Sequence, residues 1–333
     1  MKEYLKKISR GENLTREEAA VAMETIATGQ ASEAETAAFL MGLAVKHGTE
    51  AEIVGMVEVL RRHMVRVEVP YDTLDTCGTG GDGAETFNVS TTAAFVCAAA
   101  GVKVAKHGNR SVSSKSGSFD VLEALGIHFP TTPEHAEVCL DIVGIVPLFA
   151  PHFHPAMKYV GPVRKALGIR TIFNFLGPLL NPAGATYQLV GVSAKDTAQI
   201  LGSTLMSLGS KRVIIVHSQD GLDEISVAAP TEVYDFTINQ TVKIYIVEPE
   251  KRYSLAEVRG GSSTENADIM KHILSGTGTE AQNEFVVLNA GMALVAAGKV
   301  ADFREGKVLA QHILRSGTAM EKVNELIAVT KNF

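Results

Sequence analysis

The first 66 residues carry apolar side chains at helical spacing. Within residues 39–44, apolar positions four residues apart fall on one face of a helix. Three helix starts are indicated by a Ser or Thr three residues before a Glu, because the two side chains can cap each other's backbone N–H groups. They are Thr15 with Glu18, Ser32 with Glu35, and Thr49 with Glu52. Gly29 and Gly48 are predicted to end the first two helices in the left-handed conformation, so we expect a small all-helical unit.

The pattern changes near residues 69–70, where short runs of β-branched residues begin to alternate with helical stretches. This alternation indicates an α/β sheet with helices on both faces. The predicted strands are residues 102–105, 187–192 and 213–216, and the predicted helices are residues 90–100, 119–125 and 196–208. Two further strands are expected at residues 241–247 and 284–288, before a helical tail.

Residues 132–167 read as helical and interrupt this alternation, so we expect them to return to the first helical unit. The predicted small helical domain then comprises residues 1–67 and about 132–167. Residues 70–131 and 168–333 form the predicted large domain. The predicted fold class is α/β with a smaller all-helical domain and a mostly parallel central sheet flanked by helices. The small domain lacks a polar cluster, so we expect it to serve packing or dimer formation.

Composition narrows the class of protein. The chain has 333 residues, and 46% of them are apolar, which is enough for a large core. A net charge of −6 argues against a general nucleic-acid-binding protein. The N-terminal segment has no apolar signal core, and no apolar run reaches the length of a membrane span, so a cytoplasmic location is expected. The three cysteines have no metal-binding spacing and are expected to be reduced thiols.

The first candidate for chemistry is a glycine-rich segment, residues 75–83, between a predicted strand and an Ala-rich helix. Glycines let backbone N–H groups approach and surround an anion. The hydroxyl groups of residues 90–92 add donors at the positive end of the helix dipole. The segment matches neither the P-loop nor the dinucleotide fingerprint. A phosphate site is the functional interpretation, and a glycine-rich turn with an ordinary helix cap is the alternative.

The second candidate, residues 106–118, follows the strand predicted at residues 102–105. It contains three cations and five hydroxyls, which can bind phosphate oxygens. Ligands bind at the carboxyl ends of strands in open α/β sheets, so two such segments after successive strands favour a polyanion site. A solvated loop is the alternative interpretation.

The third candidate is the acidic pair Asp223 and Glu224, which follows the buried strand at residues 213–216. Magnesium typically takes one or two protein carboxylates and completes its shell with substrate phosphate and water. The alternative is a turn whose acids favour a helix N-terminus.

The fourth candidate, residues 151–165, combines aromatic rings and histidines with cations. Arg164 is suited to the carboxylate of a flat organic acid, and the rings are suited to its aromatic face. His152 and His154 lack a third zinc ligand at a standard spacing, so we do not expect a zinc site.

Taken together, these motifs resemble the anthranilate phosphoribosyltransferase family of tryptophan biosynthesis over essentially the whole chain. The matching segments are residues 14–15, 38–40, 78–82, 88–91, 106–110, 116–118, 154–164, 174–182 and 223–224. Ser111 and Phe119 depart from the family pattern, which usually has Ala at both positions. The resemblance implies a nucleoside phosphorylase-like architecture and a homodimer formed through the helical domains. It also implies transfer of a phosphoribosyl group from phosphoribosyl pyrophosphate to anthranilate, with Mg²⁺ as the cofactor.

The resemblance also implies a set of site residues. Those expected to bind phosphoribosyl pyrophosphate are Gly78, Gly81, Asp82, Thr86, Asn88, Val89, Ser90, Thr91, Lys106, His107, Gly108, Asn109, Arg110, Ser111, Val112, Ser113, Ser114 and Ser118. Those expected near anthranilate are Gly78, Asn109, Arg164, His107 and Tyr159. Ser90, Asp223 and Glu224 are expected to handle magnesium.

The expected reaction displaces diphosphate from the anomeric carbon of the ribose by the aromatic amine. The amine is neutral at pH 7, so no strong base is needed, and no residue is assigned as the general base. One alternative is a pyrimidine nucleoside phosphorylase, which the acidic pair and the hydroxyl-rich segment disfavour. The other is a non-catalytic relative that binds nucleic acid, which the net charge disfavours. We therefore expect small-molecule substrates and no nucleic-acid or membrane partner.

Overall fold

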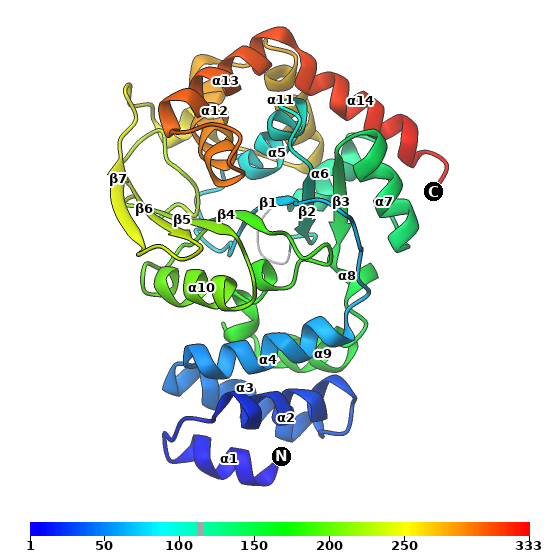
Figure 1. Cartoon of the computed structure of the whole chain (residues 1–333), viewed down its shortest axis with the longest axis vertical. Coiled ribbons are helices and arrows are strands. Elements are labelled where there is room, and N and C mark those ends of the chain that lie inside the picture. Colours follow the sequence, from blue (N-terminus) through cyan, green and yellow to red (C-terminus); the bar gives the residue numbers. More distant parts are fainter. Residues whose placement is uncertain (112–115) are drawn as a thin grey trace.

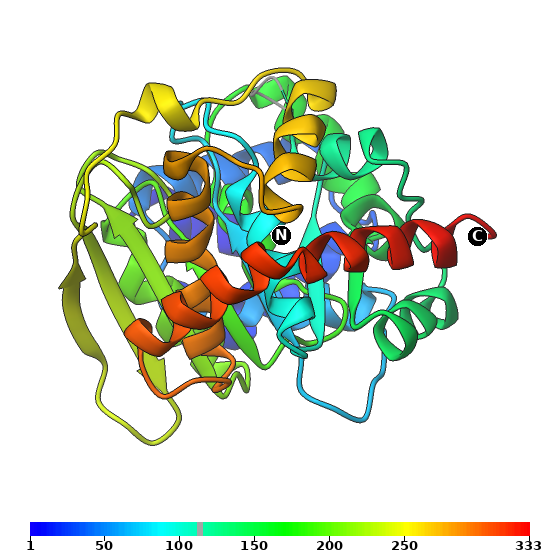
Figure 2. The same cartoon turned by 90° about the horizontal axis from the view of Figure 1, so that it is seen from above.

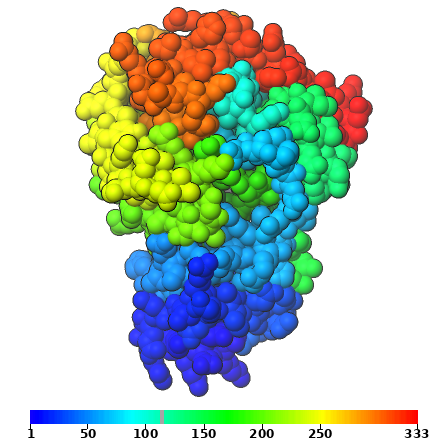
Figure 3. Space-filling view, in the orientation of Figure 1, coloured from blue at the N-terminus to red at the C-terminus, as the bar shows by residue number. Residues whose placement is uncertain are grey.

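The computed structural model describes residues 1–111 and 116–333. It consists of a small helical part and a larger α/β part (Figure 1), and the N-terminal helices form a narrower lobe in the space-filling view (Figure 3). The N-terminal helices are α1 (Lys2–Ser9), α2 (Arg16–Ala27), α3 (Glu33–Lys46) and α4 (Glu50–His63). The three predicted capping boxes are confirmed at the starts of α2, α3 and α4. One predicted helix end is wrong, because the left-handed residue after α3 is His47, with φ of 60°, and not Gly48.

The helical part has its own apolar core, to which a later segment of the chain contributes. Helix α9 (Met157–Leu167) packs against α2 and α3. Its buried Val160 and Val163 share a cluster with Phe39 and Leu40 of α3. The helical part is therefore built from two segments that are far apart in the sequence.

A seven-stranded sheet forms the centre of the larger part. Its strands are β1 (Leu74–Gly78), β2 (Val104–Gly108), β3 (Ile145–Phe149), β4 (Tyr187–Gly191), β5 (Arg212–Ser218), β6 (Thr231–Thr237) and β7 (Lys243–Val247). The spatial order is β3-β2-β1-β4-β5-β6-β7, in which β1 to β5 are parallel while β6 and β7 run antiparallel. This confirms the mostly parallel sheet. The segments that follow β1, β2, β4 and β5 leave the sheet at the same edge.

Helices cover both faces of the sheet, as predicted (Figure 1). Helix α10 (Asp196–Ser207) covers the face toward the helical part. The other face carries α5 (Val89–Ala99), α6 (Ser118–Ala124), α11 (Ser263–Leu274), α12 (Glu280–Ala296), α13 (Phe303–Ser316) and α14 (Thr318–Thr330). Seen from above, α14 crosses over this helical layer (Figure 2). Short 3₁₀ helices lie at Ile172–Asn174, Gly177–Leu179 and Leu255–Val258, and α8 is Ala150–Phe153.

Two sequence expectations are wrong. Residues 132–167 are not helical throughout, because β3 lies within them as the edge strand and α7 (Pro133–Ile142) packs against it. The strand expected at residues 284–288 is part of α12. A short apolar run suits a buried strand or a buried helix equally. Helix α12 is buried almost along its whole length between α5 and α13, so its apolar residues show no polar face.

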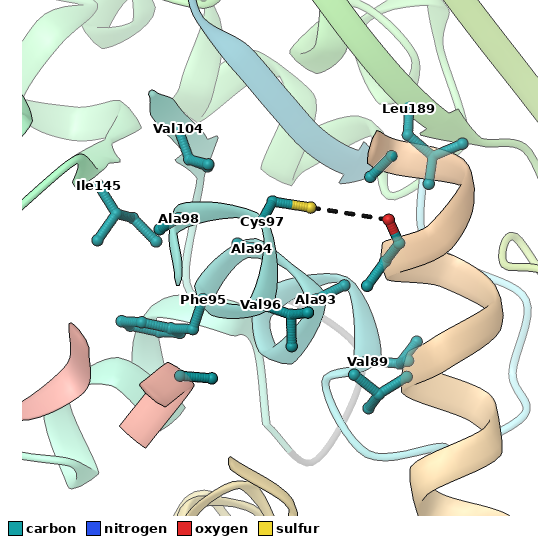
Figure 4. Packing of buried hydrophobic residues seen from close by; sticks show 14 of the residues in the cluster. Val89, Ala93, Ala94, Phe95, Val96, Cys97, Ala98, Val104, Ile145 and Leu189 are labelled. Atoms are coloured by element: carbon teal, nitrogen blue, oxygen red, sulfur yellow. Dashed lines mark hydrogen bonds between the residues drawn. The ribbon is translucent and has the colours of Figure 1, made fainter. Parts of the chain in front are cut away.

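The contact between α5 and α12 is built from small side chains. Val89, Ala93 and Cys97 of α5 lie in the main cluster beside α12 (Figure 4). The Cys97 thiol donates to the Ala290 carbonyl oxygen at 3.8 Å. All three cysteines are free thiols, as expected. Among the described residues, no helix is both long and apolar enough to cross a membrane.

Candidate active site

The glycine-rich segment after β1 meets the acidic pair after β5. The Gly80 N–H donates to Asp223 Oδ2 at 2.6 Å, and a Cβ at Gly78 would lie 2.5 Å from the same oxygen. Gly80 and Gly81 have φ of 68° and 79°, values that favour glycine. The absence of a side chain at residues 78, 80 and 81 therefore lets the backbone turn tightly over the carboxylate.

Asp223 is buried and Glu224 is half-buried, and the charges of the two carboxylates repel each other. Burial raises the pKa of Asp223 to about 7, and the nearby charge of Asp82 adds to the rise. Burial and the charge of Asp223 also raise the pKa of Glu224, while a hydrogen bond with Ser90 acts in the opposite direction. The three residues expected to handle magnesium thus come together from α5 and the segment after β5. A divalent cation would offset the repulsion between the two carboxylates.

Lys106 provides a buried cation in the same place. The structure differs from the sequence expectation here, because β2 extends to Gly108 and makes Lys106 and His107 strand residues. Lys106 Nζ donates to the Thr76 carbonyl oxygen at 2.5 Å. Burial lowers the pKa of Lys106, and the charges of Asp75 and Glu224 raise it. The ammonium group therefore lies between β1 and the acidic pair, within reach of an anion bound there.

His107 pairs with a histidine that the predicted site omitted. The Nε2 atoms of His107 and His154 lie 3.0 Å apart, and His107 Nδ1 is 3.2 Å from the Gly177 carbonyl oxygen. That carbonyl can only accept, so the proton of neutral His107 lies on Nδ1 and is donated to it. Burial lowers the pKa of His107 to about 3 and that of His154 to about 4. The pair is therefore neutral near pH 7.

A buried carboxylate holds this end of β2 in place. Asp75 Oδ1 accepts from the His107 N–H at 3.2 Å, and Asp75 Oδ2 accepts from Asn181 Nδ2 at 2.8 Å. Burial raises the pKa of Asp75 to about 6, and the charge of Lys106 opposes this rise. Asn181 also donates to the Ala105 carbonyl oxygen at 2.8 Å. The network fixes β2 relative to β1 and so fixes Lys106 and His107.

The segment after β2 folds back onto the start of α6. Ser118 Oγ donates to the Asn109 carbonyl oxygen at 3.4 Å, and the Ser111 N–H donates to Asp120 Oδ2 at 3.0 Å. The Arg110 guanidinium makes two hydrogen bonds to the Glu123 carboxylate, at 2.8 and 2.9 Å. Arg110 would have to leave Glu123 to bind a phosphate. The predicted site residues Val112, Ser113 and Ser114 lie outside the described residues.

The start of α5 presents polar groups beside the glycine-rich segment. Asn88 is the N-cap residue, and its amide donates to the Ser116 carbonyl oxygen at 3.4 Å and accepts from Asn266 at 3.0 Å. The Thr91 hydroxyl is buried and has no hydrogen-bond partner among the described residues. Thr86 forms an isolated bridge with Arg259. An unpartnered donor at a helix N-terminus is suited to an anionic ligand.

The residues predicted to contact anthranilate from α9 lie on the helical part. The Arg164 guanidinium lies 5.5 Å from the centre of the Phe173 ring, and burial lowers the pKa of Arg164. Tyr159 packs over Gly29, where a Cβ would lie 2.5 Å from its ring. No contact recorded among the described residues joins either side chain to His107 or Asn109. Their role in acceptor binding stays a prediction.

Comparisons with known proteins match the whole chain. A model described as the helical bundle domain of a glycosyl transferase family matches residues 2–64, and one described as its a/b domain matches residues 70–320. An anthranilate phosphoribosyltransferase of Desulfosudis oleivorans is 49% identical over 98% of each chain. The chain belongs to this family. The resemblance drawn from the sequence motifs is therefore confirmed.

Solved structures of the family share the fold. Anthranilate phosphoribosyltransferase of Thermus thermophilus superposes with a TM-score of 0.91 at 38% identity, covering 98% of this chain and 99% of that one. The Saccharomyces cerevisiae enzyme in complex with PRPP, which is phosphoribosyl pyrophosphate, and Mg has a TM-score of 0.90 at 28% identity. That match covers 99% of this chain and 98% of the yeast chain. A complex of the yeast enzyme with 4-fluoroanthranilate has a TM-score of 0.89 at 26% identity and the same coverage.

Two features of this family member were not visible in its sequence. Within residues 1–111 and 116–333, no three His, Cys, Asp or Glu side chains group as a metal site. Asp75 and His154 were also missed as site residues. The His-x-His spacing signalled His154, but only the fold shows its contact with His107.

Proposed function

We propose that this chain transfers the phosphoribosyl group of 5-phospho-α-D-ribose 1-diphosphate to anthranilate. The products are N-(5-phosphoribosyl)anthranilate and diphosphate, in tryptophan biosynthesis. The observation that carries the proposal is the acidic pair Asp223 and Glu224 beside the glycine-rich segment, with the buried Lys106 near it. Names of relatives that match 98% of the chain support the choice of substrates.

The donor site is formed by backbone and side chains with distinct tasks. The N–H groups after β1 and the polar start of α5 bind phosphate oxygens. Lys106 supplies positive charge from a buried position, where an electrostatic interaction is stronger than in water. These groups are fixed before the donor arrives, so they stabilise the charge that develops on the departing diphosphate.

Magnesium fits the acidic pair, and Asp223, Glu224 and Ser90 are the residues that would hold it. Their oxygen atoms are the hard donors that this ion prefers. Magnesium, when bound, would neutralise charge on the diphosphate. The residues themselves orient the glycine-rich segment, since Asp223 already accepts a hydrogen bond from Gly80.

The acceptor would lie between the end of β2 and α9. Arg164 would pair with the anthranilate carboxylate, while Asn109 and Gly78 would line the opposite side. The neutral pair of His107 and His154 would provide an uncharged surface beside the anthranilate ring. The aromatic amine is neutral at pH 7, so positioning it against the anomeric carbon is the main task of these residues. No side chain is assigned as the general base.

A homodimer formed through the helical part and a cytoplasmic location complete the proposal. Helix α3 exposes Met41 and Val45, at 45% and 67% of their maximal surface, four residues apart on one face. Val21 of α2 is 52% exposed on the same helical part. Exposed apolar side chains on one helix face are typical of a subunit contact.

The experiment follows anthranilate fluorescence after mixing the protein with phosphoribosyl pyrophosphate and Mg²⁺. We expect the fluorescence to fall with time, and to stay constant when Mg²⁺ is replaced by a chelator. A double variant, Asp223→Asn with Glu224→Gln, should lose at least about 100-fold in turnover, because it lacks both carboxylates for the metal. It should remain folded, since the substitutions remove two repelling charges.

The same assay separates this function from its closest alternative. A nucleoside phosphorylase would leave anthranilate unchanged and would release free base from uridine or thymidine in the presence of inorganic phosphate. Release of base without consumption of anthranilate would overturn the proposal. Near-normal turnover by the double variant would overturn the metal assignment.

A further inference from the structure

The glycine-rich segment also contacts a residue that the family resemblance did not assign. Helix α9 ends at Gly168, which has φ of 61°, and the chain passes through Arg170 into the 3₁₀ helix Ile172–Asn174. Arg170 therefore lies on the segment that joins α9 to the larger part. Its guanidinium Nη2 donates to the Gly80 carbonyl oxygen at 3.0 Å.

The contact is close enough to restrict the sequence of the glycine-rich segment. A Cβ at Gly81 would lie 2.1 Å from Arg170 Nη2 and 3.0 Å from the central guanidinium carbon. Gly81 also has φ of 79°. Both the space and the backbone conformation at residue 81 therefore favour glycine. The Nη2 end of the guanidinium lies closest to the turn that we propose for diphosphate binding.

The backbone of Gly80 is held by residues that follow three different elements. Its N–H donates to Asp223 after β5, and its carbonyl oxygen accepts from Arg170 and, at 3.2 Å, from the Ser193 hydroxyl after β4. Asp223 and Ser193 come from the larger part alone. Arg170 is the member of this set that lies next to α9, the helix that carries Arg164.

The Arg170 guanidinium forms no direct ion pair with a described acidic residue. Among the residues that the structure describes, no carboxylate oxygen is paired with its guanidinium. A guanidinium has five N–H donors, and a single carbonyl uses few of them. The cation therefore adds positive potential to a turn of backbone whose expected ligand carries two phosphates.

We propose that Arg170 is a positioning residue for the donor substrate. It holds the Gly80–Gly81 turn in the conformation that accepts the diphosphate of phosphoribosyl pyrophosphate. This inference rests on the proposed function and deepens it.

The test compares Arg170→Ala and Arg170→Lys with wild type, and uses Lys165→Ala as a matched control. Lys165 is an exposed cation on α9, five residues earlier. We expect Arg170→Ala to raise the KM for phosphoribosyl pyrophosphate about tenfold, the size expected for a charge-assisted hydrogen bond at an exposed site. The KM for anthranilate, measured at saturating donor, should change less than about twofold. Lys at residue 170 keeps the charge and a donor, so it should recover most of the loss.

Several outcomes would overturn the assignment of Arg170. One such outcome is a KM for phosphoribosyl pyrophosphate in Arg170→Ala that equals the wild-type value. Equal increases in both KM values would point to a general loss of structure, as would a large drop in melting temperature. A Lys variant as impaired as the Ala variant would contradict action through the Gly80 carbonyl. If wild type itself fails to consume anthranilate, the proposed function fails instead, and the two failures are therefore distinguishable.

Discussion

Burial sets the protonation state of individual side chains at the candidate active site. His107 and His154 are neutral because both imidazoles are removed from water, and Asp75 and Asp223 have raised pKa values for the same reason. A side chain that is neutral at pH 7 can line a site for an aromatic ring without attracting a counterion. A carboxylate that is costly to ionise gains more from a bound cation.

The histidine pair predicts how stability depends on pH. Both folded pKa values lie below the unfolded value of about 6.5, so the unfolded state binds more protons than the native state in the window from pH 6.5 down to about 4. The contribution of the histidine pair to stability is therefore complete above pH 6.5 and falls below it. We expect each histidine to cost about 2 kcal/mol at pH 5.0 relative to pH 7.5.

Urea unfolding at the two pH values measures this loss. His154→Gln should lack the contribution of about 2 kcal/mol that His154 makes, because Gln does not titrate. His312→Gln, at an exposed position of α13, should keep the full loss. An unchanged pH dependence in His154→Gln would contradict a low pKa for the buried pair.

Neighbouring elements of the fold approach each other most closely at glycines, because a glycine has no side chain to keep them apart. A Cβ at Gly191, at the end of β4, would lie 1.5 Å from the Asp223 carbonyl oxygen, so the absence of a side chain there lets the acidic segment approach β1. Helices α2 and α4 approach each other in the same way at Gly55. The sequence signals none of these requirements, since a glycine within a helix pattern otherwise only weakens the prediction of a helix.

A pair of Gly→Ala variants tests this close approach. In Gly55→Ala the new Cβ would lie 2.1 Å from the Arg16 carbonyl oxygen, so α2 and α4 must separate, and we expect a loss of about 1–3 kcal/mol. In Gly161→Ala, within α9, the new Cβ meets no atom within 4 Å, but Pro162 follows and offsets the gain in helix propensity, so we expect a change below about 1 kcal/mol. Thermal unfolding measures both changes. Equal stability of Gly55→Ala and wild type would show that the two helices are not packed this closely.

For the whole molecule, the site depends on how the two parts of the chain are joined. The donor groups come from β1, β2, α5 and the segment after β5, whereas Arg164 comes from α9 on the helical part. Their relative position is therefore set by the connecting segments and by contacts between the helical part and the sheet. The proposed dimer would use the far side of the helical part, away from these groups.

The dimer leads to a prediction at this scale. Met41→Glu with Val45→Glu places two charges on the exposed apolar face of α3 and should convert a dimer into a monomer. Light scattering after size-exclusion chromatography gives the mass. Ile142→Glu is the control, since Ile142 is 66% exposed on α7 of the larger part, and it should leave the mass unchanged. A wild-type mass of about 36 kDa would contradict the dimer itself, given a chain of 35.5 kDa.

The sequence by itself determined the features that depend on local pattern. The capping boxes of α2 to α4 and the parallel strands follow from residue spacing and β-branched runs, which act over a few neighbouring residues. The local pattern gave a wrong prediction where burial left a helix without a polar face. The apolar run at residues 284–288 was predicted to be a strand and is part of α12.

Only the tertiary structure decided which distant residues meet. His154 is 47 residues from His107, and Arg170 is 90 residues from Gly80, yet each pair forms a hydrogen bond. Such contacts depend on strand order and on the path of the connecting segment, which no local pattern encodes. The same holds for the pKa values of Asp75 and Asp223, because burial is a property of the folded chain.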